Sequence, residues 1–459
     1  MFQIDFNKPV SVYFIGIGGI SMSGLAEILL SKGFSVSGSD MKKSELTTLL
    51  EERGAHVYYG QRAENITDDI DLIVYTAAIR KDNPEWIAMQ QKQIPCLSRA
   101  QLLGEIMRNY ELPVAISGTH GKTTTTSMIS EILLHADADP TLSIGGILKS
   151  IDGNIRIGKS GYFVTEACEY TNSFLSFFPK ISVILNIEED HLDFFKDIDD
   201  IRHSFHQFAC LLPKDGTLII NHEIPQPDEI TDGINCPYIT YGFTKDCHYY
   251  ADNISYDELA HPSFTLHAKG YPDLLLSLGV PGRHNISNAM AAVAFADLVG
   301  IDRDITASAL SSFSGTDRRF EKKGEIGGIT IIDDYAHHPT EIEATLQAAA
   351  NYPHKTLWCI FQPHTYTRTK AFLPEFAKAL SLADKVVLAD IYAAREKDTL
   401  GISSKDLCNA VQKEGTDCYY FPSFDEIENF LLENCTQGDL LITMGAGDIV
   451  KVGENLLGK

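Results

Sequence analysis

The run SGTHGKTTT, at residues 117–125, has the composition of a phosphate-binding loop. A strand-like run (VAIS) precedes it, and a helical pattern follows it to about His135. Glycines let the backbone close around phosphate oxygens, and the N-terminus of the helix directs N–H groups at them. In this interpretation Lys122 reaches the β- and γ-phosphates of a nucleotide, and Thr123 places its hydroxyl on Mg²⁺. The residues predicted to bind ATP here are Gly118, Thr119, His120, Gly121, Lys122, Thr123 and Thr124.

This loop is shorter than the Walker pattern G-x-x-x-x-G-K-[ST]. That pattern would require a glycine at position 116, where the chain has Ile116, and the glycine comes two residues later. A glycine-rich turn that binds no ligand is the alternative interpretation. The GKTTT run between a strand and a helix favours nucleotide binding over it.

A second glycine-rich turn, GIGGIS at residues 16–21, also lies between a strand-like and a helical run. It is similar to the dinucleotide fingerprint, and Asp40 follows at about the distance needed to meet a ribose hydroxyl. The sixth position is Ser21 rather than glycine or alanine, so the match is imperfect. A nucleotide ligand of any kind, including NAD, therefore stays open, as does a tight turn needed only for packing.

Acidic residues and a histidine follow two further strand-like runs. Glu166 follows YFVT, and the run EEDH at residues 188–191 follows ISVILNI. Ligands of a parallel sheet bind outside the carboxyl ends of its strands, so these groups should share an edge with the phosphate loop. Because Mg²⁺ takes few protein ligands, Glu166 and His191 are predicted to hold a second metal ion. A helix cap or a solvated acidic loop is the alternative.

Three more segments carry polar residues at strand ends or helix starts. His284, Asn285 and Asn288 begin a helical pattern, where they suit either a base or phosphate, or helix capping. The loops DDYAHHPTE (residues 333–341) and FQPHTYTRT (residues 361–369) each follow a strand-like run. Arginine and histidine suit carboxylates and phosphates, so these loops predict an anion-binding edge. Whether His337 or His338 faces it stays open.

The alternation of strand-like and helical runs predicts three α/β domains. We expect an N-terminal Rossmann-like domain (1–111), a central ATP-binding domain (112–314) and a C-terminal Rossmann-like domain (315–459). The central domain should combine a parallel sheet with a small antiparallel annex, because residues 238–280 are rich in strand-like runs.

The composition is that of a soluble protein, with 44% hydrophobic residues and a formal net charge of −24. This charge argues against nucleic acid or an anionic membrane as a partner. The nine cysteines form no C-x-x-C pair, and the chain shows neither a leader pattern nor an apolar run that could span a bilayer. We expect a cytoplasmic protein with reduced thiols, as a monomer or weak dimer.

Taken together, the motifs resemble the Mur ligase family along essentially the whole chain. They are GIGGISMSG, YTAAI, SRAQLLGEIMR, SGTHGKTTT, EACEYTNSFL, NIEEDHLD, GRHNISNA, GTDRRFE, DDYAHHPTEI, QPHTYTRT and GAGD. The first, ninth and tenth look like the L-alanine-adding branch, and the tripeptide-recycling branch is the runner-up. The resemblance implies ATP- and Mg²⁺-dependent joining of L-alanine to the carboxylate of UDP-N-acetylmuramate through an acyl-phosphate, in peptidoglycan precursor synthesis.

The resemblance also implies roles for individual residues. Lys122, His337 and Arg368 are expected to be catalytic. The UDP-substrate would meet Gly16, Gly18, Gly19, Ser39, Asp40, Thr76, Arg99 and His120. ATP would also meet His284, Asn285, Asn288 and Arg319, while the metal would meet Thr123, Glu166 and His191. The amino-acid end would meet Asp334, Tyr335, His337 and Arg368.

Two departures from the family pattern matter. Several sister ligases use a carbamylated lysine some fifteen residues beyond the metal histidine, but residues 202–207 read RHSFHQ and contain no lysine. Cys168 stands where sister ligases have an acidic residue, so we expect no metal role for that position.

Two alternative functions remain, an NAD-dependent dehydrogenase and a non-catalytic nucleotide switch. The dehydrogenase does not explain the GTHGKTTT motif, and the nucleotide switch does not explain the first and third α/β units.

Overall fold

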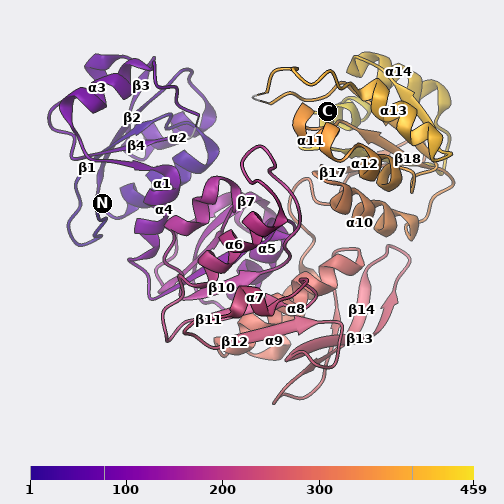
Figure 1. The fold of residues 1–459 in the computed structure, drawn as a ribbon, viewed down its shortest axis with the longest axis horizontal. Coiled ribbons are helices and arrows are strands. Elements are labelled where there is room, and N and C mark those ends of the chain that lie inside the picture. Colours follow the sequence, from indigo (N-terminus) through magenta and orange to yellow (C-terminus); the bar gives the residue numbers. More distant parts are fainter. Residues whose placement is uncertain (1, 77, 395) are drawn as a thin grey trace.

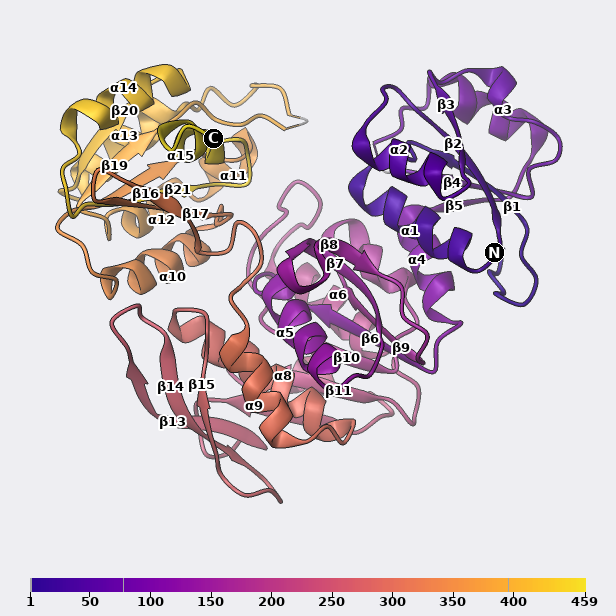
Figure 2. The ribbon, with the colours of Figure 1, turned by 180° about the vertical axis from the view of Figure 1, so that it is seen from behind.

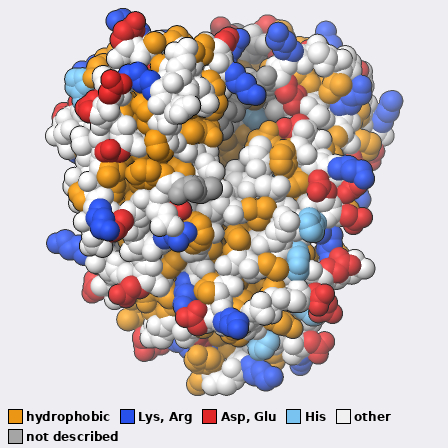
Figure 3. All heavy atoms as spheres, turned by 60° about the vertical axis from the view of Figure 1, so that its left-hand side comes forward, with side chains coloured by type: hydrophobic (Ala, Val, Ile, Leu, Met, Phe, Trp, Pro, Cys, Tyr) orange, Lys and Arg blue, Asp and Glu red, His pale blue; other side chains and the backbone are white. Residues whose placement is uncertain are grey.

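The computed structural model describes residues 2–76, 78–394 and 396–459, which form three α/β units, each built on its own sheet. The N-terminal and C-terminal units lie on opposite sides above the central unit (Figures 1 and 2). In the space-filling view the surface is hollowed near the top, and acidic and basic side chains are interspersed on this face (Figure 3). The predicted three-domain α/β class is confirmed.

The N-terminal unit has a five-stranded parallel sheet in the order β3-β2-β1-β4-β5. Its strands are β1 (Ser11–Ile15), β2 (Ser35–Asp40), β3 (His56–Tyr59), β4 (Leu72–Tyr75) and β5 (Cys96–Ser98). Its helices are α1 (Ile20–Ser31), α2 (Glu45–Glu52), η1 (Ala63–Asn65), α3 (Pro84–Lys92) and α4 (Arg99–Met107). The strand order reverses between β1 and β4, which is where ligands of such sheets bind.

The central unit has a ten-stranded sheet in the order β15-β14-β13-β12-β11-β10-β6-β9-β7-β8. Its parallel part contains β6 (Leu112–Ser117), β7 (Thr141–Leu148), β9 (Tyr162–Glu166), β10 (Ile181–Ile184), β11 (Thr217–Asn221) and β12 (Tyr238–Gly242). The strands β13 (Tyr249–Tyr256), β14 (Pro262–Ala268) and β15 (Leu274–Ser277) pair antiparallel, which confirms the predicted annex. β8 (Gly153–Arg156) pairs antiparallel with β7.

Helices cover the central sheet and hold the phosphate loop. They are α5 (Lys122–His135), η2 (Lys149–Ile151), η3 (Tyr170–Ser176), α6 (Ile198–Ala209), α7 (Asp228–Thr231), α8 (Arg283–Leu298) and α9 (Arg303–Ser312). α5 and α8 contact each other, and both are buried along most of their length. The small alanine side chains of α8 let the two helices approach closely, so α5 is fixed by packing rather than by its own helix propensity.

The C-terminal unit has a six-stranded sheet in the order β16-β17-β21-β18-β19-β20, in which only β16 runs antiparallel to its neighbour. Its strands are β16 (Glu321–Ile326), β17 (Ile329–Asp334), β18 (Leu357–Phe361), β19 (Lys385–Leu388), β20 (Asp417–Tyr420) and β21 (Leu440–Met444). Its helices are α10 (Pro339–Ala350), α11 (Tyr366–Ala371), α12 (Leu373–Leu380), α13 (Ser404–Lys413), α14 (Phe424–Asn434) and α15 (Val450–Leu456).

Element ends differ from the sequence prediction where loops make long-range contacts. The strand predicted over residues 181–187 ends at Ile184, because Asn186 turns to bond the phosphate loop. The domain boundaries after residues 111 and 314 stay predictions. None of the helices in the described part of the chain is both long and apolar enough to cross a membrane.

The contact between α4 and η3, which joins the N-terminal and central units, should be sensitive to a single methyl group. A Cβ added at Gly104 would lie 1.9 Å from the carbonyl oxygen of Ser176. We expect Gly104→Ala to destabilise the protein by about 1–3 kcal/mol through overpacking, although alanine favours a helix by about 1 kcal/mol over glycine.

Thermal unfolding measures this effect, and Gly153→Ala is the control. A Cβ at Gly153 would have its nearest neighbours at 3.7 Å, which is ordinary van der Waals contact. A lower melting temperature is expected for Gly104→Ala alone. Equal melting temperatures for the two variants would contradict the close approach of α4 and η3.

Candidate active site

The phosphate loop connects β6 to α5 and is fastened to the loop that follows β10. Asn186 makes these contacts, because its carbonyl oxygen accepts from Thr119 N–H at 3.2 Å and its Oδ1 accepts from His120 N–H at 2.8 Å. Gly121 has φ +81°, and a Cβ there would lie 2.8 Å from Oδ1 of Asn288. Glycine is therefore required by both the backbone conformation and the space available.

Lys122 forms a buried ion pair with Glu169, which the sequence analysis missed. Its Nζ lies 3.0 Å from Glu169 Oε2 and donates to the carbonyl oxygens of Thr119, at 3.0 Å, and of Gly118. Burial alone would lower the pKa of Lys122, but the Glu169 carboxylate outweighs it and raises this pKa above its usual range. Lys122 therefore stays a cation, and its position is set before any substrate binds.

The residues predicted to hold metal lie around this ion pair. Gly145 N–H donates to Oε1 of Glu166 at 2.5 Å, and a Cβ at Gly146 would lie 3.2 Å from Thr123 Cγ2. Glu166 and Thr123 thus adjoin the same glycine turn of β7. His191 lies on the other side, with its Nε2 3.7 Å from Glu169 Oε1. Carboxylate and hydroxyl oxygens suit Mg²⁺, so this donor set fits the ion, and the metal roles stay predictions.

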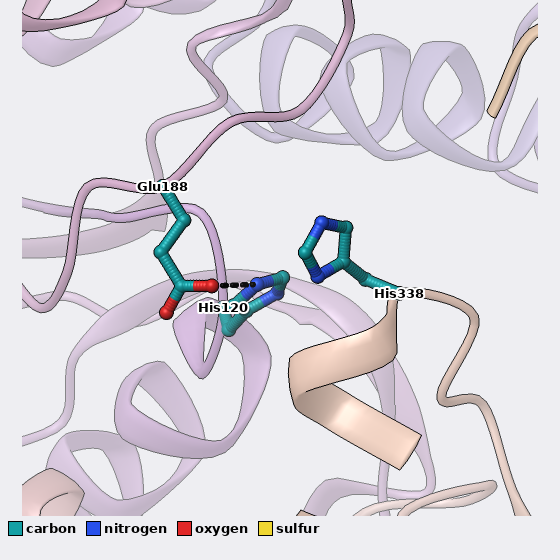
Figure 4. A group of neighbouring side chains, drawn as sticks. All are labelled: His120, Glu188 and His338. Atoms are coloured by element: carbon teal, nitrogen blue, oxygen red, sulfur yellow. Dashed lines mark ion pairs between the residues drawn. The ribbon is translucent and has the colours of Figure 1, made fainter. Parts of the chain in front are cut away.

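His120 projects from the phosphate loop to the C-terminal unit (Figure 4). Its Nε2 lies 3.4 Å from Glu188 Oε2, and its Nδ1 lies 3.2 Å from Oε1 of Glu341, near the start of α10. The ring of His338 lies 4.7 Å from that of His120. Burial opposes a charge on His120, but Glu341 and Glu188 outweigh burial and raise the pKa of His120 to about 9. The imidazolium therefore links the two units at neutral pH.

A second bond between the units joins Arg368 of α11 to Asp190. The Arg368 guanidinium donates to Oδ1 of Asp190 at 2.8 and 3.1 Å, and the two side chains are only 10% and 9% exposed. The Arg368 charge holds the pKa of Asp190 below its usual range, although burial would raise it. His364 Nδ1 lies 3.3 Å from the same guanidinium.

The structure shows in which direction each of the two adjacent histidines points, a question that the sequence left open. His338 caps α10 and faces His120, whereas His337 bonds the carbonyl oxygen of Tyr335 through Nδ1 at 3.0 Å. The ring of His337 lies 5.7 Å from that of His364. Burial lowers the pKa of His337 to about 4, so its ring is neutral at neutral pH.

A cavity of ≈ 540 Å³ lies between the central and C-terminal units. This volume suits a nucleotide-sized ligand. It brings together most of the predicted ATP residues, but also residues at strand ends that the sequence analysis did not select, such as Asn221 and Tyr256. The predicted residues among its lining are His120, Gly121, Thr124, His284, Asn285, Asn288, Arg319 and Asp334.

Burial shifts the pKa values of two residues in this cavity, and hydrogen bonds fix the orientation of two asparagines. Burial lowers the pKa of His284 to about 4 and raises that of Asp334 to about 6. Asn285 donates to the carbonyl oxygen of Pro281 at 2.7 Å, and its Oδ1 accepts from Asn288 at 3.0 Å. The two asparagine side chains thus have fixed orientations at the start of α8.

A separate cavity of ≈ 470 Å³ lies in the N-terminal unit. It brings together Gly16, Asp40 and Thr76, as predicted, and adds Gln61 and Arg80. It lies beside the point between β1 and β4 at which the strand order of the sheet reverses, where a nucleotide ligand is expected. Its glycine loop is ordered by Asp40, whose Oδ2 accepts from Gly18 N–H at 2.9 Å; Gly19 precedes α1.

Five of the residues predicted to meet the UDP-substrate lie outside this cavity lining, namely Gly18, Gly19, Ser39, Arg99 and His120, and His120 lines the cavity between the central and C-terminal units instead. The hydroxyl of Ser39 donates to the buried carboxylate of Glu85 at 2.6 Å, so it points into the core. Arg99 begins α4 and interacts electrostatically with Cys168, beside the Lys122–Glu169 pair. Burial raises the pKa of Cys168 to about 11, so this thiol is neutral.

Fold and site together define a three-domain nucleotide-binding α/β protein whose phosphate loop faces a C-terminal Rossmann-like unit. Family models match residues 11–111 ("Mur ligase family, catalytic domain"), 116–296 ("Mur ligase middle domain") and 318–447 ("Mur ligase, glutamate ligase domain"). The chain belongs to the Mur ligase family, and the resemblance of its motifs to that family is confirmed.

Relatives of known function cover the full chain. The UDP-N-acetylmuramate–L-alanine ligases of Agathobacter rectalis and Lachnospira eligens are 60% and 59% identical to it, over 100% of both chains in each case. The crystal structure of the Thermotoga maritima UDP-N-acetylmuramate–alanine ligase matches with TM-score 0.80 and 30% identity over 98% of both chains. A murein peptide ligase of Psychrobacter arcticus matches with TM-score 0.71 and 25% identity, also over 98% of both chains.

The His120 imidazolium should make stability depend on pH. The pKa of His120 is raised from 6.5 to about 9. Its contribution to the free energy of unfolding is therefore fully present below about pH 6.5 and is lost as pH rises through about 9. Replacing His120 by a side chain that does not titrate, as in His120→Asn, should lower the free energy of unfolding by up to roughly 3 kcal/mol at low pH.

Thermal unfolding of both proteins between about pH 6 and pH 10 measures the difference. The gap in melting temperature is expected to narrow as pH rises, because the parent loses its charge and the variant has none to lose. A gap that stays constant over this range would contradict the ion pairing of His120 with Glu188 and Glu341.

Proposed function

We propose that this chain joins L-alanine to the carboxylate of UDP-N-acetylmuramate at the expense of ATP, giving UDP-N-acetylmuramoyl-L-alanine, ADP and phosphate for peptidoglycan synthesis. The observation that carries this function is the contact between the phosphate loop of Lys122 and the C-terminal loop of His337 and His338, which His120 makes with Glu341 and His338. Relatives that are 50% to 60% identical over nearly the whole chain are named for this reaction. The dehydrogenase, the nucleotide switch and the tripeptide-recycling ligase are not favoured.

The reaction has two bond-forming steps. A carboxylate oxygen of the muramoyl group attacks the γ-phosphorus, the bond to ADP breaks, and an acyl-phosphate forms. The neutral amine of L-alanine then attacks the acyl carbon, and phosphate leaves as the amide forms and a proton is released. Both steps place negative charge near the phosphate loop, so the enzyme must supply positive charge there and keep water out.

Lys122 is proposed to neutralise charge on the transferring phosphoryl group. In the ligand-free arrangement its ammonium is held by Glu169, and a bound γ-phosphate would compete with that carboxylate. Thr123, Glu166 and His191 are proposed to hold Mg²⁺, which would neutralise further phosphate charge when bound. Arg368 and His337 are proposed to receive the amino-acid end, with Asp334 and Tyr335 from the same C-terminal edge.

Each of the three units is proposed to bind a different substrate. Residues 1–111 would bind the UDP-substrate, residues 112–314 would bind ATP, and residues 315–459 would bring the amino acid and close the site. The cavity around Gly16, Asp40 and Thr76 would receive the uridine end. Ser39, Gly18 and Gly19 support that loop, and Arg99 would meet the substrate nearer the phosphate loop. We propose that the enzyme works in the cytoplasm as a monomer or weak dimer.

Phosphate release from ATP tests the function directly. With Mg²⁺, release should require both UDP-N-acetylmuramate and L-alanine. Release that needs a different amino acid, or a muropeptide in place of L-alanine, would move the chain to a sister reaction. No release with any pairing would refute the ligase assignment.

Lys122→Ala should abolish ligation while binding of the UDP-substrate survives. The variant loses the cation at the phosphate loop, and the N-terminal cavity lies in another unit. We expect turnover to fall by at least about 10³-fold, the scale for a lost electrostatic contact to the transition state. Lys196→Ala is the control, because that side chain is 86% exposed. Normal turnover in Lys122→Ala would refute the role of the phosphate loop.

Arg368→Ala should impair the alanine step more than acyl-phosphate formation. Positional isotope exchange in ATP with UDP-N-acetylmuramate reports the first step, and alanine-dependent turnover reports both. The control is Lys370→Ala, which removes an exposed cation from the same helix α11. Equal losses in exchange and turnover would place Arg368 elsewhere in the reaction.

A further inference from the structure

We propose that His120, Glu188 and His338 form a binding site for a transition-metal dication of the zinc class, between the central and C-terminal units (Figure 4). The three ligands come from the phosphate loop, the loop after β10 and the N-cap of α10. One ligand atom from each residue lies within 4.8 Å of those from the other two. The site is separate from the residues proposed above for Mg²⁺.

The donor set selects the class of ion. Two imidazoles and one carboxylate are the ligands that Zn²⁺ and Co²⁺ prefer, whereas Mg²⁺ prefers a site in which oxygen donors predominate, as they do at Thr123, Glu166 and His191. In a tetrahedral zinc site with bonds near 2.1 Å, neighbouring ligand atoms lie about 3.4 Å apart. Nε2 of His120 and Oε2 of Glu188 are already 3.4 Å apart. Nδ1 of His338, which accepts from Thr340 N–H at 3.4 Å as the cap of α10, would give up that bond and rotate inward, which completes three ligands and leaves a fourth position open.

The outer partners of both histidines match those of metal-binding histidines. Such histidines usually hold their second ring nitrogen on a carboxylate or a backbone carbonyl. Nδ1 of His120 lies 3.2 Å from Glu341 Oε1, and Nε2 of His338 lies 3.1 Å from the carbonyl oxygen of Glu189. The buried Nε2 of His120 makes no hydrogen bond within the described residues, so it is available to a metal.

Charge at the site also favours a dication. The carboxylates of Glu188 and Glu341 both lie against His120, and Glu188 is oriented by the hydroxyl of Thr340, which donates to Oε2 at 2.6 Å. A dication on Nε2 of His120 would lie between this ring and the Glu188 carboxylate, while Glu341 holds Nδ1 on the other side of the ring. Because the ligands come from two units, binding would hold the C-terminal unit against the phosphate loop.

Co²⁺ titration of the full-length enzyme, without nucleotide or substrate, tests the site. We expect visible absorption bands of four-coordinate Co²⁺ with nitrogen and oxygen ligands, in the presence of excess Mg²⁺. His338→Gln should weaken Co²⁺ binding on the order of 100-fold, since even loss of an outer partner weakens a site by about 10–100-fold. His203→Gln is the control and should leave the affinity within about twofold, because that histidine is exposed on α6, away from the three proposed ligands.

Glu341→Gln provides a second test that keeps all three ligands. It removes an outer partner and should weaken binding about tenfold, with circular dichroism confirming that each variant is folded. Absorption from thiolate-to-Co²⁺ charge transfer would assign the ion to cysteines and overturn the proposal. Affinities equal to the parent in His338→Gln, or in Glu341→Gln if His338→Gln does not fold, would also overturn it. No substrate is present, so this outcome is independent of the ligase assignment.

Discussion

Residues 186–191, the loop that leaves β10, are bonded to both sides of the cleft between the central and C-terminal units. Asn186 holds the phosphate loop by accepting from His120 N–H at 2.8 Å and donating to its carbonyl oxygen at 3.0 Å. A few residues on, Asp190 accepts from Arg368 at 2.8 Å. Because the loop is short, the C-terminal unit cannot shift far without disturbing either this ion pair or the phosphate loop. In the proposed function, this one segment would place both the phosphoryl end and the amino-acid end of the reaction.

Electrostatics impose a second constraint, since the proposed substrates are anionic and the chain itself has a net charge of −24. The cations at the centre are each paired in advance: Lys122 with Glu169, and Arg368 with Asp190. Removing one partner of a buried pair leaves an uncompensated charge, at roughly 3–5 kcal/mol. The pairs therefore keep the cations in position while the site is free of ligand. In the proposed function, an incoming phosphate or carboxylate would take the place of the paired carboxylate while the cation keeps its position.

Local sequence patterns predicted the features whose cause is local. The phosphate loop, the antiparallel annex and the polar loops around His337 and Arg368 follow from glycine placement, strand alternation and residue types within a few positions. Glu169 was missed because a carboxylate three residues beyond Glu166 has no distinctive pattern; only folding brings it to Lys122. Asp190 was placed in an acidic cluster, but its partner lies 178 residues away.

The direction in which a side chain points could not be predicted from the sequence either. Ser39 lies next to Asp40 in β2, yet alternation along a strand sends its hydroxyl to Glu85 in the core. His337 and His338 are adjacent, and only the helix start at Pro339 turns the second toward the phosphate loop. Such outcomes depend on packing between elements, which motif spacing does not encode.

A double-mutant cycle tests most directly whether residues 186–191 couple the two halves of the site. Asp190→Asn, Arg368→Gln and the double variant would be compared by kcat/KM for L-alanine. A coupling free energy of about 1–3 kcal/mol is expected, because the residues form one buried ion pair. Additive losses would contradict it, since the two side chains would then act independently on the reaction.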